Sequence, residues 1–400
     1  MNQPLVERVY SWLRGDLDPK ANRILAAGLS HAEPEYVSRI ANILLERRHE
    51  SAWTGLVANY DRLPADAQKR LLDNPGLLRA GIAGAMKSRT PDARRNALAL
   101  LAEHPCPKLS YAVADALRDP APAIREAASD VLRQTAELML SDGTPLDRPT
   151  PAQSADALAA RQELVQALRE ALRTYELHHQ VDVIETCLWF AKDLGEGLWE
   201  ALSANRSQCG HVVEQHLQSW NHPRLASFLL LALGQSPWRQ MALALLNAWG
   251  NRSELIALLR SSDLLLDPDV RHNLQRLKRP RWMAAADPTL SGLPADARAQ
   301  LPHWVCHLGF SPQERLRCLR LWYASRLPEV QRSTVYALAN LDRADAARLI
   351  ADVASRPGPM QRFARWYITG KRISLSQRRR PNRTEADTLG LVAPNASDWS

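Results

Sequence analysis

The sequence predicts an all-α protein, an α-solenoid of antiparallel helix pairs, and three observations carry this prediction. The stretch from Cys106 to Ala136 has the pattern of two helices joined by a tight turn. Proline and arginine recur along the chain with a period of about 31 residues, which lies in the range of helical repeats. Almost no stretch alternates apolar and polar residues, as a half-buried strand would. Helix pairs of this size cannot bury their apolar faces alone, so they must stack on neighbours of the same kind.

The stretch from Cys106 to Ala136 contains the clearest helix pair. Asp119-Pro120 ends its first helix, because proline cannot donate a backbone hydrogen bond and disfavours helical geometry in the preceding residue. The second helix begins near Pro122, since proline is tolerated in a first helical turn. Its apolar positions follow a helical period: Ile124, Ala127, Ala128, Val131 and Leu132. They predict one buried face.

The same spacing of proline and arginine recurs elsewhere in the chain. The interval from Pro91 to Pro122 is equal to the interval from Pro328 to Pro359. An arginine follows three of these prolines at the third position, and these residues are Arg94, Arg125 and Arg362. A fixed period with proline opening the second helix of each pair is typical of a solenoid. We therefore expect Pro91, Pro122 and Pro359 to open helices.

The pattern Asp-Pro-x-Pro-x-Ile-Arg-x-x-Ala from Asp119 to Ala128 resembles HEAT repeats, in the short variant of the phycobilisome lyases. The match is clear for about two repeats around residues 88–136 and weaker elsewhere. The resemblance implies a HEAT-like superhelix. It also implies that Arg94, Arg125 and Arg362 brace neighbouring units, with ligand binding as the alternative role. Proteins with such repeats include scaffolds, adaptors, lyase subunits and a few nucleic-acid enzymes.

The repeats predict four segments along the chain. Residues 1–140 form N-terminal helical repeats, 141–154 a loop or linker, 155–370 further helical repeats, and 371–400 a basic, disordered tail. The 141–154 segment is rich in proline and glycine, and it is either a hinge or a tolerated insertion. The last helix is expected at 359–370. Two capping patterns, Ser30 to Glu33 and Ser311 to Glu314, are expected to precede helices.

Composition limits the compartment and the chemistry of the protein. The 400 residues contain no apolar run near the ~18 residues of a membrane span, and the N-terminal residues lack the pattern of a secretory signal. Five cysteines are scattered without a CxxC pair, so we expect reduced thiols in a cytoplasmic protein without a metal or other cofactor. No nucleophile-centred or phosphate-binding motif occurs, which favours a binding protein over an enzyme.

The excess positive charge is concentrated near the C-terminus. Residues 354–384 contain nine Lys and Arg and no acid, although the net charge of the whole chain is only +8. We predict that this segment binds a partner through basic side chains, namely Arg362, Arg365, Lys371, Arg372, Arg378, Arg379 and Arg380. The partner would be a protein, with nucleic acid or an anionic surface as further targets. The alternative is a tail that only improves solubility.

Three other groups of residues have a functional and a structural interpretation. Arg279 and Trp282 end a second acid-free basic run, which is either a phosphate-contacting edge or a solvated helix end. His303 and His307 have the i, i+4 spacing of metal ligands, but they also fit ordinary helix positions. The chain contains twelve tryptophans, which either line a groove or wedge between helix pairs.

Two hypotheses about function follow. The first is a non-catalytic scaffold or adaptor that binds a protein partner on its concave face, with the basic tail adding affinity. The second is a nucleic-acid-binding protein that is similar to HEAT-like DNA glycosylases. Tryptophan content and a sequence pI of about 9.4 favour the second hypothesis, whereas the location of the charge outside the repeats favours the first.

Overall fold

The computed structural model confirms the all-α solenoid. It describes residues 3–16, 18–141, 151–203, 208–220, 222–277, 280, 292–324, 327–341, 344–355, 357–358 and 360–378. For residues 3–7, 141, 151–154, 344–345 and 371–378, only the backbone is described. Every regular element of these ranges is an α-helix or a short 3₁₀-helix. Pro359, Arg279, Trp282, Arg379 and Arg380 lie outside the described residues.

The chain forms two compact units, Met1–Arg239 and Gln240–Ser400. The first contains α1 (Gln3–Gly15), α2 (Pro19–His31), α3 (Pro34–Glu46), α4 (Glu50–Ala58), α5 (Ala65–Leu72), α6 (Pro75–Met86), α7 (Pro91–Glu103), α8 (Ser110–Ala116), α9 (Pro122–Ser141), α10 (Pro151–Arg173), α11 (Tyr175–His178), α12 (Val181–Trp189), α13 (Ala191–Leu194), α14 (Glu196–Ser203), α15 (Gln208–His216) and α16 (Ala226–Ala232). The segment expected as a linker, 141–154, falls inside this unit, and most of it lies outside the described residues.

The second unit contains the remaining described helices. They are α17 (Arg239–Ala248), which begins at the boundary, α18 (Arg252–Arg260), α19 (Pro268–Leu274), α21 (Ala295–His307), α22 (Pro312–Tyr323), α23 (Pro328–Ala339), α24 (Ala344–Ser355) and α25 (Gln361–Arg378). Helix α21 contacts α18, α22 and α23, and α24 contacts α23 and α25. None of the described helices combines the length and apolar composition that crossing a bilayer requires.

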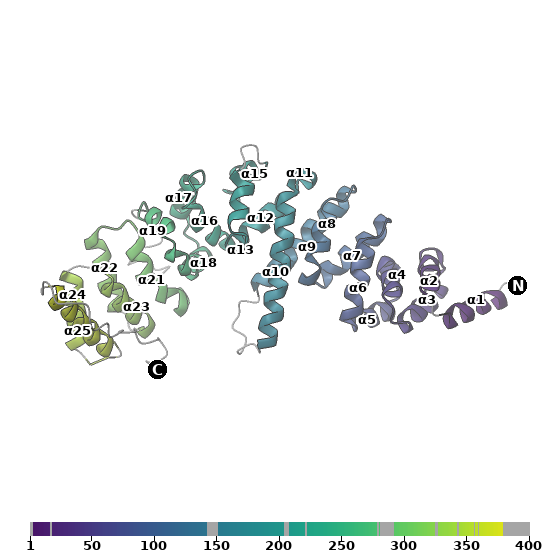
Figure 1. The fold of residues 1–400 in the computed structure, drawn as a ribbon, viewed down its shortest axis with the longest axis horizontal. Helices are drawn as coiled ribbons and strands as arrows, with labels where there is room; N and C mark the ends of the chain where they lie inside the picture. The colour runs from purple at the N-terminus through teal and green to yellow at the C-terminus, as the bar shows by residue number, and fades with distance from the viewer. Residues whose placement is uncertain are drawn as a thin grey trace. The chain divides into compact units, whose positions relative to one another are not determined.

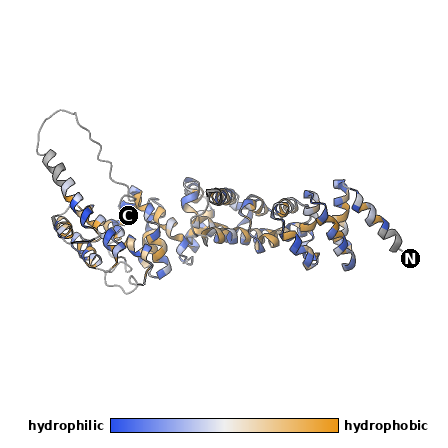
Figure 2. Ribbon diagram, turned by 90° about the horizontal axis from the view of Figure 1, so that it is seen from below, coloured by the Kyte–Doolittle hydropathy of each residue, from blue (hydrophilic) through white to orange (hydrophobic). Residues whose placement is uncertain are grey.

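In the first unit, alternate helices stack into two rows (Figure 1). In the first row α2 contacts α4, α4 contacts α6, and α8 contacts α10. In the second row α3 contacts α5, α7 contacts α9, and α9 contacts α12. Figure 2 shows hydrophobic residues on the helix sides that face neighbours and hydrophilic residues on the outward sides. This arrangement is the repeated helix pair that the regular spacing of the prolines predicts.

Proline and capping residues set many of the helix starts. Pro91 and Pro122 are the first residues of α7 and α9. At this position the backbone amide makes no hydrogen bond within the helix, so proline, which lacks an amide proton, costs little there. Ser311 and Glu314 form the expected capping box of α22. The cap expected at Ser30 is wrong. Ser30 belongs to the last turn of α2, and its hydroxyl donates to Asn59 Oδ1 at 2.8 Å instead.

Glycines let the first-row helices approach closely. A Cβ on Gly55 of α4 would lie 2.4 Å from the Cβ of Ala26 in α2. A Cβ on Gly81 of α6 would lie 2.9 Å from the Trp53 carbonyl oxygen. Real Cβ atoms do not approach other heavy atoms this closely, so α2, α4 and α6 meet at backbone distance. These helices form the tightly packed part of the first row.

The tryptophans are mostly core residues. Six of the described indoles are at most 7% exposed, and they belong to Trp53, Trp189, Trp238, Trp249, Trp304 and Trp322. Each stabilises the unit in which it lies, because a buried aromatic side chain removes a large apolar area from water. Of the other described tryptophans, Trp199 and Trp220 are half-buried, and Trp12 and Trp366 are exposed, at 63% and 45%. The wedging interpretation therefore fits most of these residues.

The final helix is longer than the sequence pattern indicates. Helix α25 passes through Gly370, where we expected an end, and continues to Arg378. A single internal glycine costs only about 1 kcal/mol of helix stability relative to alanine. The residues after it, which include Lys371, Arg372 and Leu375, are good helix formers and continue the helix.

Candidate functional site

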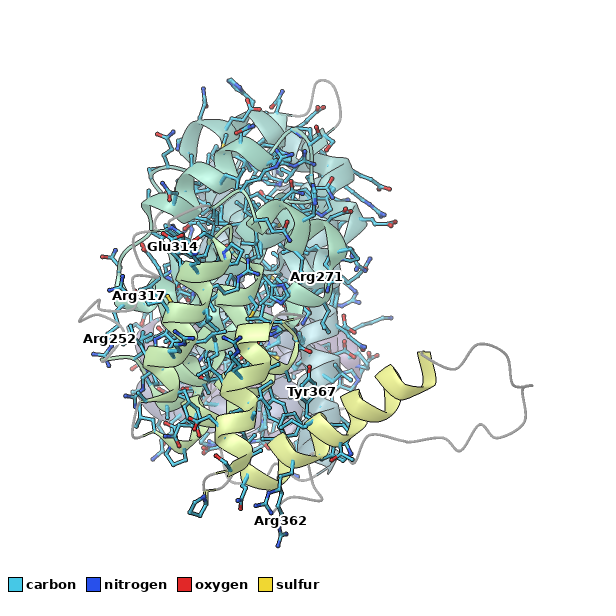
Figure 3. All side chains as sticks on the ribbon, turned by 90° about the vertical axis from the view of Figure 1, so that its left-hand side faces the viewer. Arg252, Arg271, Glu314, Arg317, Arg362 and Tyr367 are labelled. Atoms are coloured by element: carbon cyan, nitrogen blue, oxygen red, sulfur yellow. The ribbon has the colours of Figure 1, made fainter. Side chains whose placement is uncertain are left out.

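The predicted basic residues that the structure describes with side chains lie at the start of α25. Arg362 and Arg365 are both exposed, and Arg362 points away from the ribbon (Figure 3). Arg365 is partly engaged, since its Nε donates to the Ala354 carbonyl oxygen at 3.1 Å. Lys371, Arg372 and Arg378 lie farther along α25, where the backbone alone is described.

Aromatic rings join this part of α25 to α23. The ring centroids of Tyr336 and Phe363 are 4.5 Å apart in an edge-on arrangement. Phe363 also contacts Trp366 at 5.8 Å and Tyr367 at 6.4 Å, and the Tyr367 hydroxyl donates to the Ala339 carbonyl oxygen. Tyr336 and Trp366 remain 42% and 45% exposed. The rings therefore fix α25 against α23 and still present apolar area to solvent.

Arg332 extends the same face, because it lies one turn before Tyr336 on α23 and is exposed. We define Arg332, Tyr336, Arg362, Phe363 and Trp366 as the α23–α25 surface. Tyr336 and Arg332 were not predicted as site residues. They lie before α24 in the sequence, whereas the basic residues of α25 lie after it, and only the packing of α23 on α25 brings the two groups together.

The excess positive charge belongs to the second unit. Residues 240–400 contain 24 Lys and Arg against 14 Asp and Glu, whereas residues 1–239 contain 27 against 29. The second unit thus has a net charge of +10 and the first a net charge of −2. An acidic partner is attracted to the second unit at long range, and salt screens that attraction.

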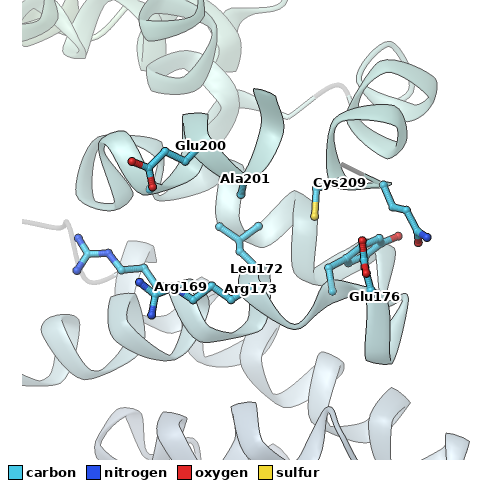
Figure 4. Close-up of a pocket in the computed structure, with 10 residues that line it drawn as sticks. Arg169, Leu172, Arg173, Glu176, Glu200, Ala201 and Cys209 are labelled. Atoms are coloured by element: carbon cyan, nitrogen blue, oxygen red, sulfur yellow. The ribbon is translucent and has the colours of Figure 1, made fainter. Parts of the chain in front are cut away.

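A separate cavity of about 390 Å³ lies in the first unit between α10, α11, α14 and α15 (Figure 4). Arg169, Arg173 and Glu200 lie at one end, and Glu176 and Cys209 lie at the other. Burial and the neighbouring Cys209 raise the pKa of Tyr175. Its described lining residues are a mixture of charged, polar and apolar side chains. Its residues are spread over four helices, so no sequence motif marks it.

His303 and His307 lie on one face of α21, with ring centroids 4.8 Å apart. Burial lowers the pKa of both rings, that of His307 to about 4. The positive charge of Arg271 acts in the same direction on both rings, and that of Arg315 acts so on His307. The nearby Cys306 thiol donates to the Pro302 carbonyl oxygen at 3.4 Å, and burial raises its pKa to about 11. No cluster of three or more metal-ligating side chains occurs in the described part of the chain. Two neighbouring arginines disfavour a divalent cation here.

Two of the three repeated arginines contact the turns between helices, whereas Arg362 is exposed and points away from the ribbon. Arg94 Nη1 donates to the Ser88 carbonyl oxygen at 2.6 Å, and its Nε lies 2.5 Å from Asp119 Oδ2 in the next repeat. Arg125 Nη1 donates to the Asp119 carbonyl oxygen at 2.8 Å. The Arg94 and Asp119 side chains are only 13% and 5% exposed. Removing one member of a buried ion pair costs about 3–5 kcal/mol. We propose that Arg94 and Arg125 have a bracing role.

Comparisons with known proteins add little to this assignment. No protein-family model and no curated protein matches the chain, so the likeness to phycobilisome-lyase repeats rests on the motif alone. Among solved structures, the chain is similar to the crystal structure of Kap121p bound to Ste12p, at 12% identity and a TM-score of 0.21. The match covers 87% of this chain and 48% of the other, so the chain spans about half of that structure. At this TM-score the match carries no argument, and the fold assignment rests on the stacked helix pairs, which fit HEAT-repeat proteins.

Proposed function

We propose that this protein is a non-catalytic solenoid scaffold that binds an acidic protein partner through the α23–α25 surface. The observation that supports the proposal is the combination of exposed rings and exposed arginines on one face. Tyr336 and Trp366 offer apolar area, while Arg332 and Arg362 offer charge beside them. Aromatic and arginine side chains are the residue types that dominate protein interfaces energetically.

The basic residues beyond Gly370 belong to the same proposal. Lys371, Arg372 and Arg378 continue α25, and Arg379 and Arg380 follow them in the sequence. Such a basic extension increases the rate of encounter with an acidic partner more than it increases the affinity of the docked complex.

Nucleic-acid binding is the second candidate, and the same surface favours it. Aromatic rings stack on bases and arginines contact phosphates, so Trp366 beside Arg362 suits single-stranded nucleic acid as well. The two candidates differ in their dependence on salt. Several phosphate contacts make affinity fall steeply as salt rises, because binding releases condensed counterions.

The test compares two charge-matched variants of the full chain. Arg332→Glu/Arg362→Glu reverses the surface, and Arg252→Glu/Arg317→Glu makes the same charge change on α18 and α22 (Figure 3). Binding of a labelled poly-glutamate peptide and of a labelled single-stranded oligonucleotide is measured at two salt concentrations. Affinity purification from native lysate, treated with nuclease, is run in parallel.

We expect the surface variant alone to lose the poly-glutamate peptide and an acidic protein that survives nuclease treatment. Equal losses in both variants would show that net charge, and not this surface, drives binding. If the chain binds the oligonucleotide with a steep salt dependence and retains no protein from the lysate, the protein-partner proposal is refuted in favour of nucleic-acid binding.

A further inference from the structure

A second basic site lies in the first unit, far in sequence from the α23–α25 surface. It is a polar groove with a volume of about 570 Å³ between α1, α3 and α5. Each helix contributes one arginine to it: Arg14 from α1, Arg39 from α3 and Arg70 from α5. Glu46 is the only acidic side chain among its described lining residues. We call this site the N-terminal groove.

The arginines follow the repeat of the fold. The interval from Arg39 to Arg70 is the same as that from Pro91 to Pro122, and each arginine is the sixth residue of its helix. The stacking of α3 on α5 therefore places two guanidinium groups in equivalent positions. Arg14 precedes them on α1, whose packing on α3 is shown by the stacked rings of Tyr10 and Tyr36.

Two of the three arginines, Arg14 and Arg70, have contacts weak enough to be exchanged. Arg14 Nη2 donates to both Glu46 carboxylate oxygens, at 3.1 and 3.0 Å, but these side chains are 64% and 48% exposed. Exposed ion pairs of this kind contribute little, because water competes with both partners. Arg70 Nη1 donates to the neutral Asn42 amide oxygen at 2.6 Å. The lining residues of the groove include three arginines and one glutamate, so their net charge is positive.

We propose that the N-terminal groove binds an extended acidic peptide segment whose carboxylates recur at every third residue. Packed helices lie about 8–10 Å apart, which sets the spacing of arginines in successive helices. A peptide in the extended polyproline II conformation advances about 3.1 Å per residue with three residues per turn, so every third side chain lies on the same face, about one helix spacing apart. Guanidinium groups bind carboxylates through paired hydrogen bonds, which adds geometric selectivity to the charge attraction.

Charge favours a short peptide over nucleic acid at this site. The first unit as a whole has a net charge of −2, so a long polyanion meets repulsion outside the groove. A short acidic segment contacts the three arginines and avoids the rest of the surface. The inference goes beyond the proposed function, because the groove and the α23–α25 surface share no residue.

The test uses fluorescence anisotropy with twelve-residue labelled peptides of equal charge. One peptide has three glutamates spaced three residues apart in a Gly/Ser background, and the other has its three glutamates contiguous. All measurements use the full chain in the Arg332→Glu/Arg362→Glu background, so that a failure of the groove and a failure of the proposed function are seen separately. Arg39→Gln/Arg70→Gln removes two charges from the groove, and Arg79→Gln/Lys87→Gln removes two exposed charges at α6.

We expect the spaced peptide to bind more tightly than the contiguous one, and the Arg39/Arg70 variant to weaken it about tenfold or more. The Arg79/Lys87 variant should bind as the parent does. Glu46→Gln should tighten binding, because it removes the carboxylate that competes for Arg14, and this gain cannot come from misfolding. Equal affinity for both peptides, no effect of Glu46→Gln, or preference for a single-stranded oligonucleotide would overturn the proposal.

Discussion

Replacing Gly55 by alanine tests the close packing of α2 on α4. The added methyl group would lie 2.4 Å from the Ala26 Cβ, about 1 Å closer than an ordinary contact. Overpacking of this kind costs about 1–3 kcal/mol and sometimes more, while alanine regains about 1 kcal/mol of helix propensity. Because 2.4 Å is far below any real Cβ contact, the upper part of this range applies, and we expect a net loss of about 1–2 kcal/mol.

The measurement is the thermal unfolding of the full chain by circular dichroism. A loss of this size lowers the Tm of a unit of about 240 residues by roughly 2–8 °C. Gly197→Ala in α14 is the matched control, since its Cβ would meet no atom within 4 Å. The control should be neutral or slightly stabilising.

The double variant Ala26→Gly/Gly55→Ala is the decisive comparison. It moves one methyl group from α2 to α4, and the new Cβ would lie 3.4 Å from the Cα of residue 26, an ordinary contact. The clash disappears and the helix-propensity terms cancel, so the Tm should return close to that of the parent. Close packing of α2 on α4 is refuted if Gly55→Ala is as stable as Gly197→Ala, or if the double variant loses the sum of both single effects.

Three further predictions concern single residues. Arg94→Ala should lower the free energy of unfolding by about 3 kcal/mol, because it breaks a buried ion pair, whereas Arg95→Ala, which removes an exposed pair, should change it by less than about 1 kcal/mol in denaturant titration. The pKa of His307 is about 4 in the folded chain and ~6.5 when unfolded, so the unfolded state binds more protons between these values. Stability should therefore be unaffected above pH 6.5 and fall by about 1–3 kcal/mol towards pH 4, with a shallower fall in His307→Gln; a flat profile would contradict the burial of this ring. Burial raises the pKa of the Cys187 thiol far above its usual range, so a thiol reagent at pH 8 should modify the partly exposed Cys106 first, as peptide mass spectrometry would show.

The sequence was sufficient for the fold because its signals act locally. Pro91 and Pro122 set helix starts through their own backbone, and the apolar period of residues 122–132 is the buried face of α9. The cap expected at Ser30 is wrong because α2 extends to His31, so Ser30 is itself helical, and Glu33 is the residue that precedes α3. The end expected at Gly370 failed because one glycine does not outweigh the helix formers that follow.

The sites were harder to predict because they depend on stacking. Arg362 was found from the charge of its own segment, but Tyr336 reaches the same surface only through the packing of α23 on α25. The N-terminal groove combines arginines from three separate helices, and no local pattern connects them. Gly55 allows close packing because it faces Ala26 of α2, and the residues around Gly55 in the sequence do not indicate this contact.

The close approach of α2, α4 and α6 has a mechanical consequence. At Gly55 and Gly81 no side chain separates the glycine from the neighbouring helix. Sliding of one helix along the other cannot be absorbed there by a change of rotamer, so it would break these close contacts. Elastic deformation of the first unit must then concentrate at joints where larger side chains fill the interface. Any bending of the first unit is therefore expected at those joints, while α2, α4 and α6 move together as one rigid body.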